Sequence, residues 1–456
     1  MRTRRHRASR FWPRRSGTIL VLTSLVLLTI VGMLGLVLDS GLLMSQYRQV
    51  QNSADAAALA AAQSLIDGKT ETTARTVGTS FVTNYNGLGN ATVTIRIPPT
   101  SGPYNANLKF AEAIVEFPIQ TRLIQLLGGP ASRTVSARAV AGYQAVSSSA
   151  GVIALDPEAT PGFMAVGNGT FIIDGTGITN SEGGGVDENG DPVDGLNGYG
   201  AQVSGNGVIK GRLILVNGGV NRPDGFIQYD PANPDNPLVA LAGLYPDPFR
   251  YLPTPTVSTG VDPTNRGSIK VSGENTNATF YPGVYSDIQV SSGTARLMPG
   301  IYVVKGGEVR ITGGTVTAAG VMFYLTGSDY SPYTGLPDAN DGEARPPHTT
   351  GNPFGGVTIN SGAFLSPLAN TGGPYDGMLI YHRRFNDSVI DVAGNAYDGL
   401  MTGTVYAKWS LLKLAGQGVF NTQFVVGQVT WRGNGTMILN YNGRTLAKGN
   451  MVFLVE

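Results

Sequence analysis

The sequence predicts a mainly β protein that one N-terminal helix holds to a membrane. Three observations lead to this prediction: an uncharged apolar run near the start, an alanine-rich segment after it, and many short apolar runs separated by glycine and asparagine. With 63 Gly and 27 Pro in 456 residues, the chain is rich in turn-forming residues. We therefore expect an N-terminal transmembrane and stalk α-helix, a small α/β collar, and an irregular right-handed β-helix-like solenoid.

The apolar run covers residues 18–38 and contains no charged side chain. At about 1.5 Å per residue, a helix of this length spans roughly 30 Å, the thickness of a bilayer's hydrocarbon core. A basic tail, residues 1–17, precedes the run, and Asp39 follows it. The positive-inside rule then puts the N-terminus in the cytoplasm and the body outside. A cleaved signal peptide is the alternative, but its hydrophobic region would be shorter and followed by a small-x-small site.

Residues 39–67 are predicted to continue the helix as a stalk. The stretch 42–66 lacks Pro and Gly and is rich in alanine, so its helix propensity is high. Apolar and small side chains recur on one stripe: Leu43, Val50, Ala54, Ala57, Ala61 and Leu65. We interpret the stripe as the core face of the stalk, with a helix–helix assembly surface as the alternative.

Two stretches of this region resemble a known family. Asp39-Ser40-Gly41 and the run 51–62, QNSADAAALAAA, look like the N-terminal segment of Flp pilus-assembly TadE/TadG-like proteins. The motif residues are Asp39, Gln51, Asn52, Ala54, Asp55, Ala57 and Leu59. The resemblance implies an inner-membrane protein of the tight-adherence secretion and pilus system. Because Leu22 stands where a processed pilin precursor would carry Glu, we expect a permanent anchor.

Residues 68–145 are predicted to form the collar. Alternating patterns indicate strands near 91–97, 111–117 and 134–141, and a short helical turn at 122–127 ends at Gly128-Gly129-Pro130. A long helix lying on a three-stranded antiparallel sheet would bury the alanine stripe.

Residues 146–456 carry short repeated themes. Gly-Asn-Gly or a variant occurs at 167–169, 205–207, 394–396, 416–418 and 433–435, and Pro-Gly-Val/Ile-Tyr occurs at 282–285 and 299–302. Short strands closed by Gly or Asn corners favour a solenoid over the alternative, a β-sandwich or jelly roll. Loops near 230–264 and 326–356 interrupt the repeats, and such excursions are where binding usually resides.

Reactive groups are scarce in the sequence. There is no cysteine, and the body contains only two histidines, His348 and His382. A carbohydrate-active enzyme would need clustered carboxylates, for which the candidates are Asp341, Glu343, Asp387 and Asp391. The run 382–384, His-Arg-Arg, is expected to be a solvated strand end. The acidic stretches 187–191 and 338–343 are expected to be plain turns rather than calcium loops. We expect no catalysis, no cofactor and no metal.

The function expected from the sequence is that of a membrane-anchored, non-catalytic structural or assembly component of a Flp-type pilus or related surface apparatus. Its expected location is the bacterial inner membrane, with the body periplasmic or extracellular. The expected partners are the lipid bilayer and other pilus-assembly or envelope proteins, with self-association left open. No nucleic acid is expected, because the body without its basic tail is mildly acidic. The alternatives are a surface adhesin that binds glycan or a neighbouring cell through 326–356, and a tethered polysaccharide-active enzyme.

Overall fold

The computed structural model describes residues 16–346, 354–360, 363–368, 372–396, 401–441 and 445–455. The chain is mainly β and begins with one long helix. It divides into two compact units, of which unit 1 comprises residues 1–144 and 451–456 and unit 2 comprises residues 145–450. Residues 451–456 thus belong with the collar rather than with the domain 146–456 in which the sequence places them. Residues 1–15 of the predicted basic tail lie outside the described residues.

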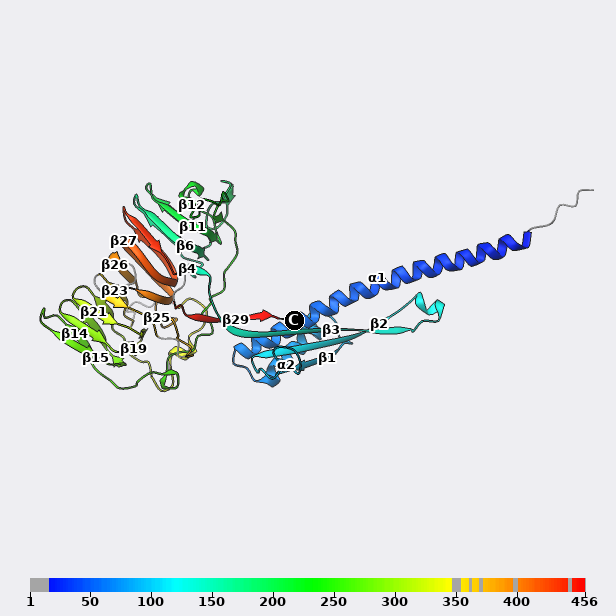
Figure 1. Cartoon of the computed structure of the whole chain (residues 1–456), viewed down its shortest axis with the longest axis horizontal. Helices are drawn as coiled ribbons and strands as arrows, with labels where there is room; N and C mark the ends of the chain where they lie inside the picture. The colour runs from blue at the N-terminus through cyan, green and yellow to red at the C-terminus, as the bar shows by residue number, and fades with distance from the viewer. Residues whose placement is uncertain are drawn as a thin grey trace, which may run out of the picture. The chain divides into compact units, whose positions relative to one another are not determined.

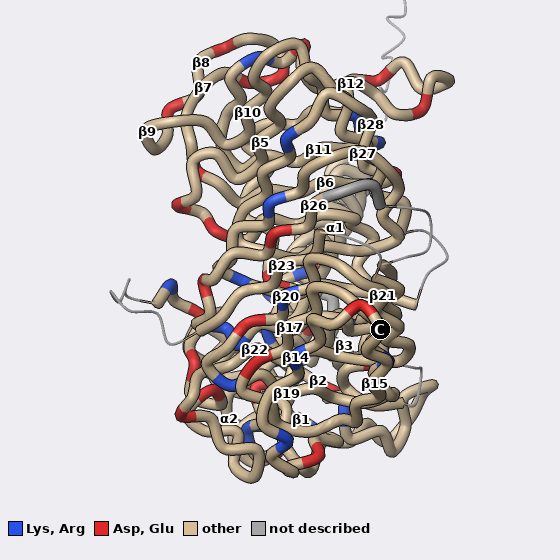
Figure 2. The backbone as a smooth tube through the Cα atoms, turned by 90° about the vertical axis from the view of Figure 1, so that its left-hand side faces the viewer, with Lys and Arg blue, Asp and Glu red and all other residues tan. Residues whose placement is uncertain are grey.

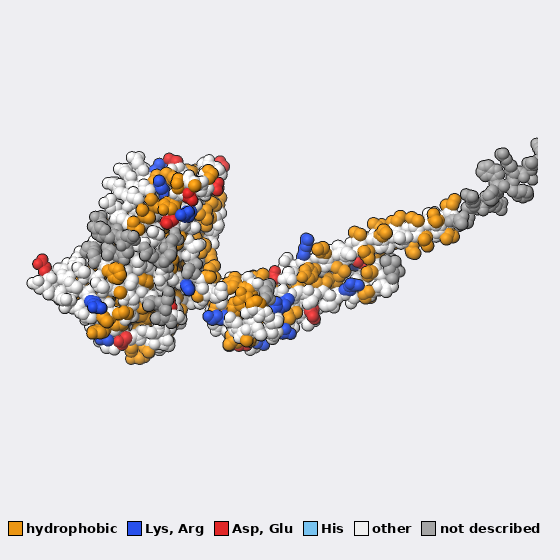
Figure 3. All heavy atoms as spheres, viewed as in Figure 1, with side chains coloured by type: hydrophobic (Ala, Val, Ile, Leu, Met, Phe, Trp, Pro, Cys, Tyr) orange, Lys and Arg blue, Asp and Glu red, His pale blue; other side chains and the backbone are white. Residues whose placement is uncertain are grey.

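Unit 1 begins with α1 (Ser16–Ile66), an uninterrupted helix that contains both the predicted span and the predicted stalk. Among the described residues, α1 is the one helix long and apolar enough to cross a membrane. Its large apolar side chains from Ile19 to Leu38 are exposed, and they form an apolar surface along the helix in Figure 3.

The sheet of unit 1 lies against the C-terminal half of α1. It contains β1 (Thr92–Arg96), β2 (Phe110–Gln120) and β3 (Ser132–Ser147), paired antiparallel as predicted. A fourth strand, β29 (Lys448–Leu454), lies beside β3 in this sheet (Figure 1), although the sequence places these residues in the domain 146–456. Next to it, the Val455 N–H donates to the Val140 carbonyl at 2.8 Å.

Three short helical segments complete unit 1. They are α2 (Glu71–Ser80), the π-helical η1 (Phe81–Tyr85) and the 3-10 helix η2 (Ile124–Leu127). Only η2 matches a predicted helical turn. It ends, as the sequence predicts, at Gly128, whose φ of 80° is left-handed. Thr70 is the N-cap of α2, and its hydroxyl accepts a hydrogen bond from the Thr73 N–H.

Unit 2 contains many short strands and one very long one, β27. The strands of its N-terminal part are β4 (Ala150–Ala154), β5 (Phe163–Val166), β6 (Thr170–Thr179), β7 (Gly183–Val186), β8 (Pro192–Val193), β9 (Leu196–Tyr199), β10 (Ala201–Ser204), β11 (Val208–Val216), β12 (Phe226–Gln228) and β13 (Leu238–Val239). The later strands are β14 (Ser268–Val271), β15 (Asn277–Phe280), β16 (Gly283–Tyr285), β17 (Asp287–Val290), β18 (Thr294–Leu297), β19 (Gly300–Lys305), β20 (Val309–Ile311), β21 (Thr315–Ala318), β22 (Val321–Thr326), β23 (Val357–Ile359), β24 (Ala363–Leu365), β25 (Met378–His382), β26 (Ile390–Ala396), β27 (Thr402–Arg432) and β28 (Thr436–Leu439). Its 3-10 helices are η3 (Pro223–Gly225), η4 (Val257–Thr259) and η5 (Asp338–Asn340).

From β14 to β23, each strand pairs in parallel with the third strand after it. One ladder runs β14-β17-β20-β23-β26, a second runs β15-β18-β21-β24, and a third runs β16-β19-β22-β25. Figure 2 shows β14, β17, β20 and β23 one above another. Each passage through three strands therefore adds one layer to the stack.

The first strands of unit 2 lie in the middle of this stack. β27 pairs with β25 and β26 on one side and with β4 and β5 on the other. β6 pairs with β28 on one side and with β11 on the other, and β5 likewise pairs with β10. β12 and β13 pair with β11, so β10 to β13 extend the stack on the side of β4 to β6 that faces away from β27. The chain then returns to β14 through the connection 240–264.

That connection, part of the predicted loop 230–264, packs along the stack and covers outward-facing side chains. A buried apolar cluster lies between this connection and the β16–β19–β22–β25 ladder. The connection contributes Phe249, Leu252 and Val261, and the ladder contributes residues such as Val303 and Tyr324. Polar contacts add to the packing, because the Arg384 guanidinium donates to the carbonyls of residues 249, 250 and 252 at 3.2, 2.6 and 2.9 Å. The expectation that 382–384 is a solvated strand end is therefore wrong.

The two repeated themes form stacked corners. In the Gly-Asn-Gly corners, the Asn434 side chain accepts from the Asn168 N–H at 3.3 Å, and the Asn168 side chain accepts from the Asn206 N–H at 3.4 Å. In the Pro-Gly-x-Tyr corners, the rings of Tyr285 and Tyr302 stack with centroids 5.8 Å apart. Corners that repeat in the sequence thus lie on one another in successive layers.

Candidate functional site

The candidate site is the stretch of α1 that carries the motif residues, together with the collar elements that hold it. Ala54 and Ala57 are fully buried and pack against the sheet alanines Ala113 and Ala139. Small side chains allow the helix and the sheet to approach closely, which larger residues would prevent. The structure therefore supports the core-face interpretation of the alanine stripe.

Helix α2 packs on the same alanines from a second side. A Cβ at Gly78 would lie 2.9 Å from the Ala57 carbonyl oxygen and 3.3 Å from the Ala61 Cβ. The backbone of α2 at Gly78 therefore packs directly against the motif alanines of α1. No helix is predicted for α2 from the sequence, although Thr70 followed by Glu71 is a helix-start signal.

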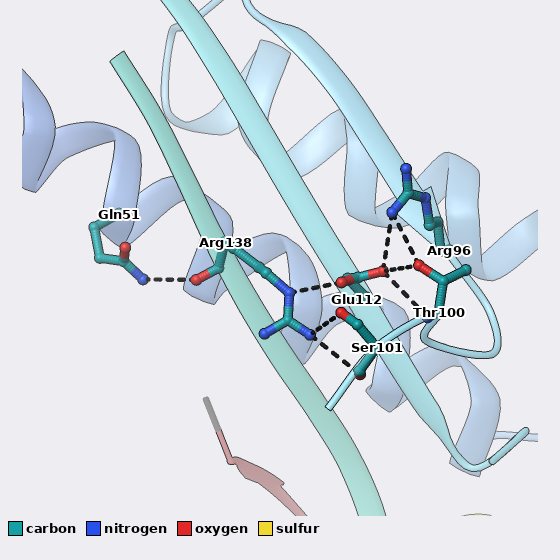
Figure 4. Close-up of polar contacts among 6 residues, drawn as sticks. All are labelled: Gln51, Arg96, Thr100, Ser101, Glu112 and Arg138. Atoms are coloured by element: carbon teal, nitrogen blue, oxygen red, sulfur yellow. Dashed lines mark hydrogen bonds and ion pairs between the residues drawn. The ribbon is translucent and has the colours of Figure 1, made fainter. Parts of the chain in front are cut away.

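Gln51 and Asp55 connect the helix to β3. The Gln51 side-chain amide donates to the Asp55 carboxylate at 2.8 Å. It also donates to the Arg138 carbonyl at 3.3 Å (Figure 4). The first contact joins residues one helical turn apart, and the second crosses from α1 to the sheet. Together they fix the rotation of α1 relative to β3.

Arg138 also holds a buried carboxylate that the sequence does not reveal. Its Nε donates to Glu112 Oε1 at 2.6 Å, while Arg96 and the Thr100 hydroxyl approach Glu112 Oε2 at 3.4 and 3.3 Å (Figure 4). Burial raises the pKa of Glu112, but the Arg138 guanidinium and the Thr100 N–H outweigh it and hold that pKa below its usual value. Glu112 therefore stays ionised and ties three parts of the collar together.

Asp39 caps the turn between β2 and β3. Its carboxylate accepts hydrogen bonds from the backbone N–H groups of Ile124, Leu123 and Arg122 at 2.7, 3.0 and 3.4 Å. The Ile124 contact is the largest cause of the lowered pKa of Asp39. This motif residue therefore has a defined structural role, which is to dock η2 onto α1.

The other motif residues face away from the sheet. Asn52 is exposed, and Leu59 is 36% exposed. With Arg48 they form an outward stripe at helical spacing, which we call the outer stripe (Arg48, Asn52, Leu59). The motif residues thus divide into a set that builds the collar and a set left available to a partner.

Two of the carboxylates considered for catalysis are each held by a cation. Asp341 accepts two hydrogen bonds from the Arg383 guanidinium at 2.7 and 2.9 Å, and Glu343 pairs with Lys408. Asp387 lies in the turn before β26, and Asp391 lies within that strand. The first two carboxylates therefore fasten the 326–356 segment to the strands beneath it. Residues 347–353 of that segment, with His348, lie outside the described residues.

His382 is completely buried. Its Nδ1 lies 3.0 Å from the Ser410 hydroxyl, and burial lowers the pKa of His382 to about 3. Among the described residues, the His382 Nε2 has no hydrogen-bond partner, so no carboxylate of that part of the chain orients the ring as in a hydrolytic triad.

The two acidic stretches considered for calcium are used within the fold. The Asp187 carboxylate accepts from the backbone N–H groups of Asn189 and Asp191 at 2.8 and 2.9 Å, which closes a turn. In the second stretch, Asp338 pairs with Arg383 at 3.0 Å. Within the described part of the chain, no group of three or more metal-binding side chains comes together.

These observations define an α1 segment with an apolar half, a collar-building face and an exposed outer stripe. Residues 16–64 match the model of the Flp pilus-assembly TadE/G-like family, which confirms the predicted resemblance over this segment. No curated protein and no solved structure matches the chain.

Proposed function

We propose that the chain is a membrane-anchored, non-catalytic structural or assembly component of a Flp-type pilus or a related surface apparatus. The observation that carries the proposal is the segment 16–64, which matches the family model and lies wholly within α1. Its first half is apolar and exposed, as a membrane span requires. One face of its second half packs against the collar, and the outer stripe on the opposite face is exposed and would contact a partner.

In this proposal, residues 18–38 cross the bacterial inner membrane and the basic tail stays in the cytoplasm. The asymmetry of arginines before the span and Asp39 after it supports this orientation. The collar and unit 2 are then periplasmic or extracellular.

We further infer that unit 2 is a β-helix in which three strands make up one turn. The three parallel ladders of third-neighbour strands, the stacked asparagine corners and the stacked tyrosines support this inference. The alternative, a sandwich or jelly roll, is built from antiparallel pairs. A β-helix would provide a rigid extracytoplasmic body.

A non-catalytic role agrees with the chemistry of the candidate carboxylates. Asp341 and Glu343 are each held by a cation, and His382 is buried and neutral. Groups bound in this way are poor general acids or bases, because their protons and lone pairs are already engaged.

The proposal is tested in the strain that encodes the chain, by deletion and complementation, with surface pili counted by electron microscopy. The informative variant is Leu59→Glu, which places a charge on the outer stripe. Thr72→Glu is the matched control, because it adds the same charge at an exposed position of α2. We expect pili to be lost with Leu59→Glu and kept with Thr72→Glu, at equal amounts of protein in the membrane fraction.

Normal pili in the deletion strain would contradict the assembly role. Attachment to surfaces and to neighbouring cells would then be measured, because an adhesin would lose attachment without losing pili.

A further inference from the structure

The turn between β2 and β3 lies against the apolar half of α1. Leu123, at the start of this turn, packs directly on Gly35, where an added Cβ would lie 2.9 Å from the Leu123 Cβ. Figure 1 shows the tip of the β2–β3 hairpin beside α1, well toward the N-terminal end of the helix from α2. The turn therefore reaches the level of the predicted span.

Its depth follows from the helical rise. If residues 18–38 fill the hydrocarbon core, Gly35 lies about 4.5 Å inside the boundary, at 1.5 Å per residue. A turn that contacts Gly35 then reaches the membrane surface. This inference rests on the proposed function, in which α1 spans the bilayer.

The composition of the turn suits that position. The stretch 123–131, LIQLLGGPA, has no charged residue, while the exposed Arg122 and Arg133 flank it. Leu123 and Ile124 remain partly exposed within unit 1. At a membrane interface, the apolar side chains of the turn would contact the acyl chains, and the two flanking arginines would contact the phosphate head groups.

Several backbone polar groups of the turn are hydrogen-bonded within the protein, as a position with little water requires. Asp39 accepts from the N–H groups of residues 122–124 at 2.7 to 3.4 Å. The Gly129 N–H donates to the Ile124 carbonyl at 3.0 Å, and the Thr121 N–H donates to the Ala131 carbonyl at 3.1 Å. Backbone groups at a lipid boundary must find partners within the protein, because unsatisfied groups are costly there.

We propose that the β2–β3 turn, residues 121–131, is a second membrane contact that inserts its apolar edge into the lipid interface on the collar side. The occupant of this surface is the bilayer itself. The contact holds the collar against the membrane and limits its rotation about α1.

The experiment uses the full chain in vesicles of phosphatidylethanolamine and phosphatidylglycerol. Because the chain has no cysteine, a Leu126→Cys variant carries a single environment-sensitive fluorophore, and Leu127→Cys serves if the first label disturbs folding. Quenching is measured with lipids that carry a nitroxide near the top of the acyl chain. Leu28→Cys, which lies at the bilayer centre if residues 18–38 fill the hydrocarbon core, reports on the span, and its quenching is measured with lipids that carry the nitroxide near the end of the acyl chain. Asn105→Cys is the collar control, since the 11 residues of β2 separate the two loops by roughly 35 Å.

We expect several-fold quenching at position 126 or 127 and none at position 105. A quenched label at position 28 with unquenched labels at 126 and 127 would overturn the second contact while leaving the span intact. An unquenched label at position 28 would reject the span itself, and the proposed function would fail with it.

Discussion

Arg138 Nε lies 2.6 Å from Glu112 Oε1, and the carbonyl of the same Arg138 accepts from Gln51 on α1. One residue of β3 thus holds a buried carboxylate with its side chain and the motif helix with its backbone. The motif segment and the collar are therefore one structural unit. A substitution in either should change the stability of both.

Arg138→Met should weaken the collar, because Glu112 would lose its closest cation. Arg96 would remain nearby and Arg138 is itself 33% exposed, so we expect a loss of about 2 kcal/mol, below the range for fully buried pairs. Hydrogen exchange of β2 and β3 amides should accelerate by roughly 30-fold. Arg133→Met, at an exposed position of β3, is the control, and equal effects of the two variants would refute the role of the pair.

Gly78→Ala should destabilise unit 1 although alanine favours helices. The new Cβ would lie 2.9 Å from the Ala57 carbonyl, so α1 and α2 must separate, at a cost of about 1–3 kcal/mol. Gly41→Ala on α1 meets nothing within 4 Å and should instead stabilise by up to about 1 kcal/mol. Thermal unfolding of the detergent-solubilised chain, followed by far-UV circular dichroism, compares the two. A stabilised Gly78→Ala variant would show that the packing is looser than described.

Asp39→Ala should loosen the β2–β3 turn. Three backbone N–H groups would lose their shared acceptor, and we expect a cost of about 1 kcal/mol, typical of a lost helix N-cap. Exchange of the amides of residues 122–124 should accelerate about fivefold. Asp67→Ala, which removes an exposed carboxylate near the end of α1, should leave these amides unchanged.

The stability of unit 2 should fall in acid because of His382. The pKa of His382 is about 3 in the fold, against 6.5 for a histidine exposed to solvent, so the unfolded chain takes up a proton first as the pH falls. The contribution of His382 is therefore fully present above pH 6.5 and is lost between that pH and about 3. Asp338 acts in the opposite direction. Burial raises its pKa to about 6, so its contribution to the unfolding free energy is lost as the pH rises from 3.8 through 6.

A His382→Gln variant separates the two effects. Between pH 6 and pH 4, the signed slope of its unfolding free energy against pH should be lower than that of the parent chain by about 1.4 kcal/mol per pH unit, while the opposing slope from Asp338 stays the same in both. Denaturant unfolding followed by tryptophan fluorescence suits the measurement, because Trp409 and Trp431 both lie in unit 2. Identical slopes would mean that the pKa of His382 is the same in the folded and the unfolded chain.

Much of the collar could be predicted from local pattern. Strand alternation located β1, β2 and β3, and Gly128 marked the end of η2, because these signals depend on neighbouring residues. The fourth strand, β29, could not be assigned to this sheet, since an apolar strand at 448–454 fits any sheet edge equally well. Local sequence does not specify a partner so far away along the chain.

The site was predicted unevenly for a similar reason. The motif alanines revealed their buried face through helical spacing. Glu112 alternates with Ala111 and Ala113, so the pattern placed it on the opposite face of β2 but gave no sign that this face is covered. Arg383 and Arg384 were expected in solvent because they end a strand, and their partners come from the distant segments 338–341 and 249–252.

The pairing of β29 with β3 has a consequence for how the protein is made. The two strands are neighbours in the collar, yet all of unit 2 is translated between them. The collar sheet therefore stays incomplete until unit 2 has been synthesised. In the topology we propose, a molecule whose export stalls within unit 2 would carry an open sheet edge next to its span, a substrate for envelope proteases.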